Sequence, residues 1–104
     1  MYLKTREQII DLLHRASAGA INRSDFSDQF THLYLHREGW PILDHRDKVF
    51  FDVILEKLYW TTDDPLPEER VYGLRDFTEF RRWLADALER YSKGETVADL
   101  DEPF

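Results

Sequence analysis

A chain of 104 residues with 42% hydrophobic content is long enough for one packed core and too short for two. It has no cysteine, which excludes a disulfide scaffold and thiolate metal ligands, and its formal net charge of −7 opposes the clustered cations that nucleic-acid binding requires. No apolar run approaches the length of a membrane span, and no secretory leader is recognisable. We therefore expect a soluble, cytoplasmic protein that contacts neither nucleic acid nor membrane directly.

A first helix is predicted over residues 6–18. Thr5 and Gln8 have the spacing of a capping box, in which each side chain bonds the backbone N–H of the other residue. Gly19 is suited to the left-handed conformation that commonly ends a helix. Between these points apolar residues recur at helical spacing, namely Ile9, Leu13 and Ala16.

A second helix is predicted to begin after Ser24, whose hydroxyl can cap a free backbone N–H group. It is expected to end near Gly39 and before Pro41, because proline cannot continue a helix. Its apolar arc consists of Phe26, Phe30, Leu33 and Tyr34. His32 and His36 lie one turn apart on its flank, a spacing that suits zinc. Since no further ligands converge there, we expect two solvent-facing histidines and no metal site.

The stretch 44–61 is predicted to form the helix around which the fold is organised. Asp44 is its expected N-cap. Its polar residues form a narrow stripe at intervals of four, namely Lys48, Asp52 and Glu56. A helix that is apolar over most of its remaining circumference needs neighbours on two or three sides. We therefore expect an all-α fold, an antiparallel four-helix bundle, with this helix in its middle.

The last predicted helix begins after Asp76, which forms a second capping-box pattern with Glu79, and it ends before Gly94. Its apolar series is Phe77, Phe80, Leu84, Ala87, Leu88 and Tyr91. Buried side chains are expected at Phe50, Ile54, Phe80 and Leu84. The bundle is predicted as a single domain over residues 1–94, and an acidic tail over 95–104 is expected to be disordered or draped across it.

The acidic segment 62–79 is the strongest functional candidate in the sequence. Residues 61–80 hold six acidic residues and two arginines, and residues 62–75 are the longest stretch between helices that is expected to be irregular. A solvated linker would also be acidic, but here the acids are interleaved with Leu66, Val71, Tyr72 and Leu74. That mixture is typical of a surface that steers and anchors a basic partner. The candidate partner-binding residues are Glu56, Trp60, Asp63, Asp64, Glu68, Glu69, Tyr72, Asp76 and Glu79.

No residue pattern typical of catalysis is present. The serines lie at expected caps or helix ends, and the four glycines are too scattered to form a phosphate-binding loop. The carboxylate pairs at 63–64 and 68–69 lack the apolar pocket that separates the pKa values of an acid and a base. We therefore expect a protein that is not an enzyme and that uses no cofactor.

The layout resembles that of the colicin D immunity protein family and of related bacterial immunity proteins, including those that neutralise contact-dependent growth-inhibition toxins. The resemblance covers roughly residues 9–91. It rests on a first helix followed by Ile21-x-x-Ser24-Asp25-Phe26, an apolar third helix, an acidic loop that leads to Tyr72, Leu74 and Asp76, and a final amphipathic helix.

This resemblance implies an antiparallel four-helix bundle that binds a basic ribonuclease domain one to one. The acids of the immunity protein would stand in for the phosphates of the tRNA substrate, and the matching positions are Glu56, Asp63, Asp64, Glu68 and Glu69. We therefore expect an immunity protein that covers the basic active site of a toxin nuclease. The alternative is a non-enzymatic regulatory or adaptor protein that self-associates or docks on a cellular partner.

Overall fold

The computed structural model describes residues 2–35 and 45–95 of the chain. These parts contain no β-strand and five α-helices, namely α1 (Tyr2–Ser17), α2 (Arg23–Leu35), α3 (His45–Tyr59), α4 (Pro67–Val71) and α5 (Phe77–Ser92). The predicted all-helical class is therefore confirmed for the described residues. None of these helices is long and apolar enough to cross a membrane. The expectations for His36, Gly39, Pro41, Asp44 and residues 96–104 fall outside the described residues.

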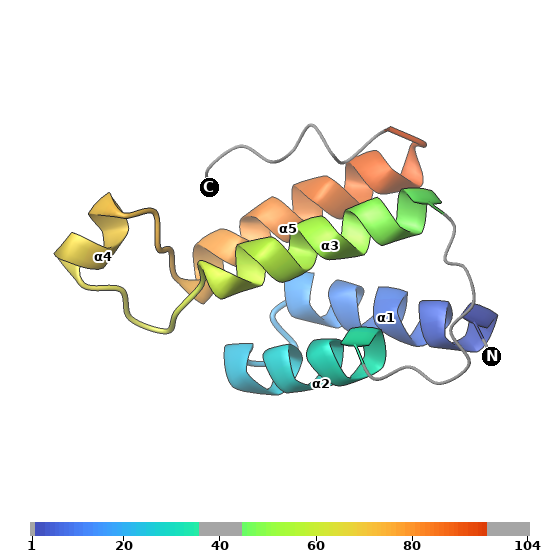
Figure 1. Cartoon of the computed structure of the whole chain (residues 1–104), viewed down its shortest axis with the longest axis horizontal. Helices are drawn as coiled ribbons and strands as arrows, with labels where there is room; N and C mark the ends of the chain where they lie inside the picture. The colour runs from blue at the N-terminus through green and yellow to red at the C-terminus, as the bar shows by residue number, and fades with distance from the viewer. Residues whose placement is uncertain (1, 36–44, 96–104) are drawn as a thin grey trace.

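Each of the four long helices packs closely against two others. α1 packs against α2 and α5, and α3 packs against the same two helices. Figure 1 shows α3 beside α5, with α1 and α2 side by side beneath them. α3 therefore has neighbours on two sides, within the predicted two or three, but it is no more central than the other three long helices. Its polar stripe is exposed as predicted, but its apolar arc is wider than its buried face, since Val49 and Leu55 are only half-buried and Tyr59 and Trp60 are exposed.

Aromatic side chains form a continuous part of the core. On α2 the rings of Phe26 and Phe30 stack with centroids 5.6 Å apart, and Phe26 also meets Phe80 of α5 at 5.7 Å. At the other end of α5, the ring of Tyr91 stacks on Phe50 of α3 at 4.3 Å. Offset and stacked aromatic pairs add attraction beyond the area that they bury. The four residues predicted to be buried are all fully enclosed, namely Phe50, Ile54, Phe80 and Leu84.

The starts of the first two helices differ from the prediction. α1 begins at Tyr2, so Thr5 lies inside the helix instead of capping it. The cap of α2 is Asn22 and not Ser24, because the side-chain oxygen of Asn22 accepts the N–H of Asp25 at 2.8 Å. Asparagine is at least as good an N-cap as serine, and it stands earlier in the chain.

The predicted ends of α1 and α5 are confirmed. Gly19 adopts a positive φ of 78°, and the N–H of Ala20 donates to the carbonyl of Arg15 at 2.9 Å. This is the Schellman pattern, which satisfies carbonyls that the helix leaves free at its end. The chain leaves α5 in the same way at Gly94, where the N–H of Glu95 donates back into the last turn.

A buried polar contact joins three helices at the end of the molecule opposite α4. Asp47 of α3 is 5% exposed, and its carboxylate accepts the Arg6 Nε–H of α1 at 2.8 Å. The same guanidinium donates to the hydroxyl of Tyr91 on α5 at 3.1 Å. A buried carboxylate is tolerated when it is paired and hydrogen-bonded. No sequence pattern indicates this contact, because it joins residues far apart in the chain.

We expect Ile54→Ala and Leu84→Ala each to lower the free energy of unfolding by about 2–5 kcal/mol, because each empties a fully enclosed site. The measurement is denaturant unfolding followed by circular dichroism. Arg82→Ala is the matched control on α5, since Arg82 is exposed and should change stability by less than about 0.5 kcal/mol. Equal effects of the three substitutions would contradict the assigned helix faces.

Candidate functional site

The segment between α3 and α5 projects from the packed helices and is drawn in yellow in Figure 1. We call residues 60–76 the α4 arm. Residues 62–75 were expected to be irregular, but Pro67–Val71 forms a short helix. Pro67 occupies the first helical turn, where its missing N–H has no helical partner to lose. The backbone N–H of Leu66 donates to the carboxylate of Glu69 at 2.9 Å and so holds the start of α4.

Backbone hydrogen bonds close the arm at its base. The N–H of Thr62 donates to the carbonyl of Arg75 at 2.9 Å, and the N–H of Arg75 donates to the carbonyl of Trp60 at 2.9 Å. Together they form an isolated parallel bridge between Thr61 and Arg75. Thr61 is buried, and its hydroxyl donates to the carbonyl of Lys57 on α3 at 2.8 Å. Both legs of the arm are therefore held to each other and to the end of α3.

Gly73 turns the chain back after α4. Its φ of 108° lies in a region that residues other than glycine rarely adopt. The N–H of the next residue, Leu74, donates to the carbonyl of Glu69 at 3.0 Å. A Cβ at this position would lie 3.9 Å from Cε3 of Trp60. The indole of Trp60 therefore lies close to the turn that follows Val71 and Tyr72.

Three of the predicted partner-binding acids form ion pairs within the chain. Asp63 accepts two hydrogen bonds from Arg23 at the start of α2, at 2.8 Å and 3.0 Å. The hydrogen bond from this guanidinium holds the pKa of Asp63 below its usual value. Arg70 donates to Glu79 at 2.7 Å and to Asp76 at 3.2 Å, and its own pKa is raised by the bond to Glu79. These three acids are therefore used to hold the arm in place.

Asp76 has a second role as the N-cap of α5. Its carboxylate accepts the N–H of Glu79 at 2.8 Å, and the Glu79 side chain accepts the N–H of Asp76 at 3.5 Å, which confirms the predicted capping box. The pKa of Asp76 is lowered, first by the bond from the Glu79 backbone and then by the guanidinium of Arg70. One carboxylate thus stabilises the start of α5 and fastens α4 to it.

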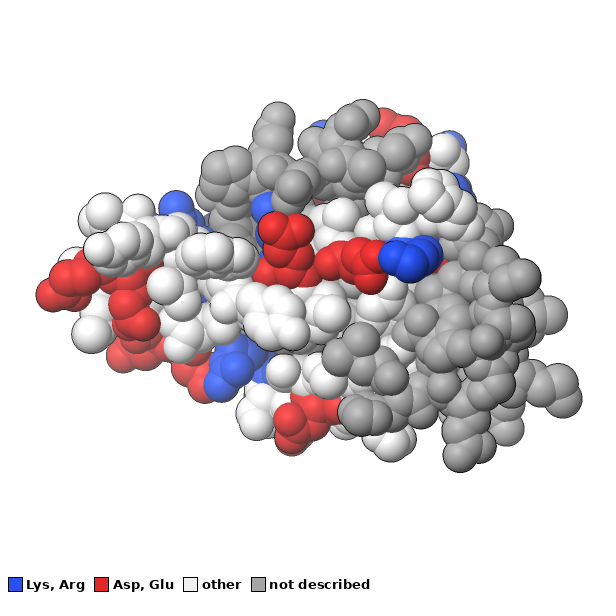
Figure 2. Space-filling view, viewed as in Figure 1, with Lys and Arg blue, Asp and Glu red and all other residues white. Residues whose placement is uncertain are grey.

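The acids that remain available for a partner lie on the outside of the arm and on α3. Glu56, Asp64 and Glu68 are exposed, and among the residues that the structure describes they form no ion pair. Glu69 also has no ion pair there, although one of its oxygens accepts the N–H of Leu66. Figure 2 shows acidic side chains gathered over α4 beside uncharged surface, and a second line of them over α3.

Exposed apolar side chains are concentrated in the same region. Within residues 6–34 and 45–95, every large hydrophobic residue classed as exposed falls in the short stretch 59–72. They are Tyr59 (75% exposed), Trp60 (44%), Leu66 (59%), Val71 (87%) and Tyr72 (80%). The sequence analysis did not single out Tyr59. Its position could have been found by continuing the polar stripe of α3 beyond Glu56 by three residues.

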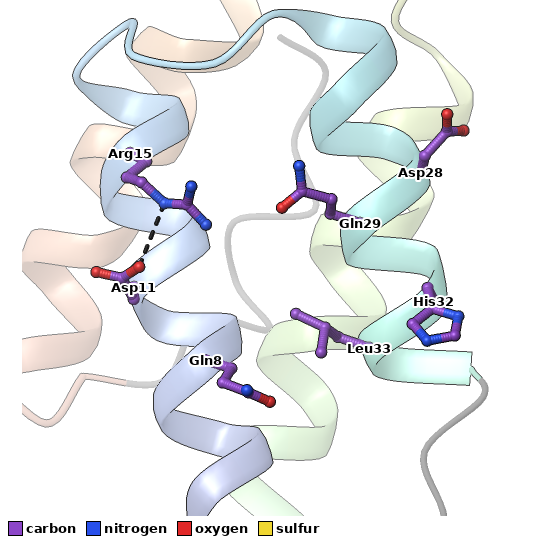
Figure 3. A pocket seen from close by; sticks show the side chains of 7 residues that line it. All are labelled: Gln8, Asp11, Arg15, Asp28, Gln29, His32 and Leu33. Atoms are coloured by element: carbon purple, nitrogen blue, oxygen red, sulfur yellow. Dashed lines mark ion pairs between the residues drawn. The ribbon is translucent and has the colours of Figure 1, made fainter.

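A hollow lies between α1 and α2 and has a volume of about 440 Å³ (Figure 3). It is lined by Gln8, Asp11, Arg15, Asp28, Gln29, His32 and Leu33. Two of its charged side chains form an ion pair, since Arg15 Nε lies 3.2 Å from a carboxylate oxygen of Asp11. In the described part of the chain, no three His, Cys, Asp or Glu side chains are grouped so that they could hold a metal ion. This hollow therefore has no group of metal ligands, whereas the α4 arm combines exposed apolar side chains with acids that form no ion pair among the described residues.

Comparison of the chain with protein-family models, with curated proteins and with solved structures finds no match. Evidence for a function therefore comes from the chemistry of the α4 arm itself. The arm combines a backbone held at several points, exposed apolar side chains and acids without internal partners. A preordered backbone lowers the cost of binding, and exposed apolar side chains can form the core of an interface. Acids beside them favour a partner of positive charge.

We expect Asp76→Ala to lower the free energy of unfolding by about 0.5–2 kcal/mol at neutral pH, because it removes the N-cap of α5. The ionised carboxylate has a lowered folded-state pKa, so its contribution is complete above the unfolded value of about 3.9 and is lost as the pH falls through the folded value. Unfolding curves of the variant and the parent should therefore converge on acidification below about pH 4.

Asp86→Ala is the matched control for Asp76→Ala. Asp86 lies on the same helix, but it only forms an exposed ion pair with Arg90 at 3.2 Å. Such pairs contribute about 0.3–0.5 kcal/mol. If the two substitutions destabilise the chain equally at neutral pH, the contribution of Asp76 as the N-cap of α5 is contradicted.

Proposed function

We propose that this chain is a bacterial immunity protein, a non-catalytic inhibitor that binds the nuclease domain of a toxin and covers its basic active site with the α4 arm. One observation carries the proposal: within residues 6–34 and 45–95, all exposed large apolar side chains lie in the stretch 59–72, which also presents acids that form no ion pair among the described residues. Contiguous apolar surface on a single chain commonly marks a protein-binding site. Acids beside it select a partner of positive charge.

A nuclease active site is a suitable partner for this chemistry. It must bind phosphate groups, so it is lined by lysine and arginine, and those cations attract a protein that presents carboxylates. The acids proposed for this contact are Glu56, Asp64, Glu68 and Glu69. Asp63, Asp76 and Glu79 belong to the support of the arm, because each is already paired with an arginine of the same chain. A tRNA-cleaving nuclease is the class that the family resemblance implies.

The scaffold in this proposal is an antiparallel four-helix bundle made of α1, α2, α3 and α5, with the arm inserted between its third and fourth helices. Packing of each long helix against two others supports this arrangement. The proposed place of action is the cytoplasm of the producing cell, where a nuclease would meet that cell's own RNA. The absence of cysteine fits such a reducing compartment.

The proposal implies that a toxin with a nuclease domain is encoded beside this chain. The test is a kinetic binding series against that nuclease domain, with its catalytic residues inactivated. We expect the double reversal Asp64→Lys and Glu68→Lys to slow association about tenfold or more at low salt. The difference should shrink as ionic strength rises, because charges are screened over about 8 Å at physiological salt. Melting curves should stay close to that of the parent, since both side chains are exposed.

The control for net charge is the double reversal Asp86→Lys and Glu89→Lys, which makes the same change on the exposed side of α5. It should slow association less than reversal on the arm does. If the parent does not bind the nuclease domain, the proposed function is wrong. If both double reversals slow association equally, the acids of the arm have no special role.

A further inference from the structure

Three exposed apolar side chains belong to the turn at Gly73 or border it. Val71 is the last residue of α4 and Tyr72 is its C-cap, and they are 87% and 80% exposed. Trp60 reaches this turn from the other leg of the arm, with its ring 3.9 Å from where a Cβ of residue 73 would lie. We call Trp60, Val71 and Tyr72 the aromatic ridge. Exposed apolar side chains that are grouped in one short segment are more informative than single ones, because large apolar patches commonly mark binding sites.

The backbone beneath the ridge is held before any partner arrives. Hydrogen bonds from Thr62 and Arg75 close the base of the arm, and the N–H of Leu74 closes the turn after α4. The bidentate pair of Arg23 and Asp63 ties the first leg of the arm to α2. Ordering a loop on binding costs affinity, and a loop that is already ordered avoids this cost. Tyrosine and tryptophan have few rotatable bonds, which lowers the cost further.

Acids flank the ridge on the same short helix. Glu68 precedes Val71 by three residues and Tyr72 by four, the spacings at which helical side chains are neighbours. The complementary surface is therefore an apolar hollow with lysine or arginine on its rim. A second copy of this chain fits poorly, because a symmetric contact would bring the same acids together. The net charge of −7 opposes such a contact as well.

We propose that the aromatic ridge is the energetic anchor of the interface, and that it inserts into an apolar hollow, rimmed by basic residues, on the nuclease domain. This inference rests on the proposed function and deepens it. The ridge and the acids have separate roles. Burial of the ridge sets how slowly the complex dissociates, and the acids set how fast it forms.

The experiment compares Tyr72→Ala with Tyr72→Phe in binding to the inactivated nuclease domain of the toxin encoded beside this chain. Tyr72→Ala should raise the dissociation rate about tenfold or more, by an equal factor at low and high salt, because an apolar contact is lost. Tyr72→Phe keeps the ring and should dissociate within about threefold of the parent rate. Both variants should have the same melting temperature as the parent, since Tyr72 is 80% exposed.

Four outcomes separate the two proposals. A raised dissociation rate for Tyr72→Ala alone supports the ridge as anchor. If the parent binds but Tyr72→Ala dissociates at the parent rate, the ridge is overturned and the proposed function stands. If the parent does not bind the nuclease domain, both proposals fall. If sedimentation shows that the parent forms dimers that Tyr72→Ala separates, the occupant of the ridge is a second copy and the inference is wrong.

Discussion

The carboxylate of Asp76 is one of the contacts that join the α4 arm to the packed helices. It accepts the N–H of Glu79, the third residue of α5, and a hydrogen bond from the guanidinium of Arg70, which also reaches Glu79 at 2.7 Å. Because α5 lies in the core, this contact makes the position of α4 depend on the core. α4 has no buried residue of its own. A five-residue helix without a core is not stable in isolation, so its order must come from such contacts.

The arrangement divides the acidic residues of residues 61–80 into two groups. Asp63, Asp76 and Glu79 are paired with arginines that belong to the same region or to α2, and they keep the arm in place. Asp64, Glu68 and Glu69 form no ion pair among the described residues and remain available, although one oxygen of Glu69 accepts the N–H of Leu66. Counting charges along the sequence therefore overstates the negative surface that a partner would meet. The proposed interface is correspondingly more apolar than the sequence alone suggested.

Local rules predicted the parts of the fold that depend on neighbouring residues. Helical periodicity identified the buried faces of α3 and α5, and the spacing of Asp76 and Glu79 identified the capping box. The short helix α4 was missed because five residues are too few to show a period. The pairs of Arg23 with Asp63 and of Arg6 with Asp47 were also missed. Each joins residues about 40 positions apart, and such contacts follow from tertiary packing.

The sequence indicated the segment that holds the candidate site, but not which of its acids form ion pairs within the chain. Clustering of acids with tyrosine and leucine pointed to residues 62–79, and the exposed side chains of the arm lie within or beside this segment. The sequence could not show which acids would be neutralised, since that depends on how the arm folds back on α5. It also could not show that the ring of Trp60 lies beside the turn at Gly73, because that depends on how the two legs of the arm come together.

Amide hydrogen exchange of the free chain and of its complex with the nuclease domain tests the central claim most directly. In the free chain, the hydrogen-bonded amides of Thr62, Leu74 and Arg75 should already exchange slowly, because the arm is ordered before binding. On binding, exchange should slow further across residues 60–76 and stay unchanged in the walls of the hollow between α1 and α2. Fast exchange of those three amides in the free chain, or protection confined to the walls of that hollow, would contradict a preordered arm that binds the partner.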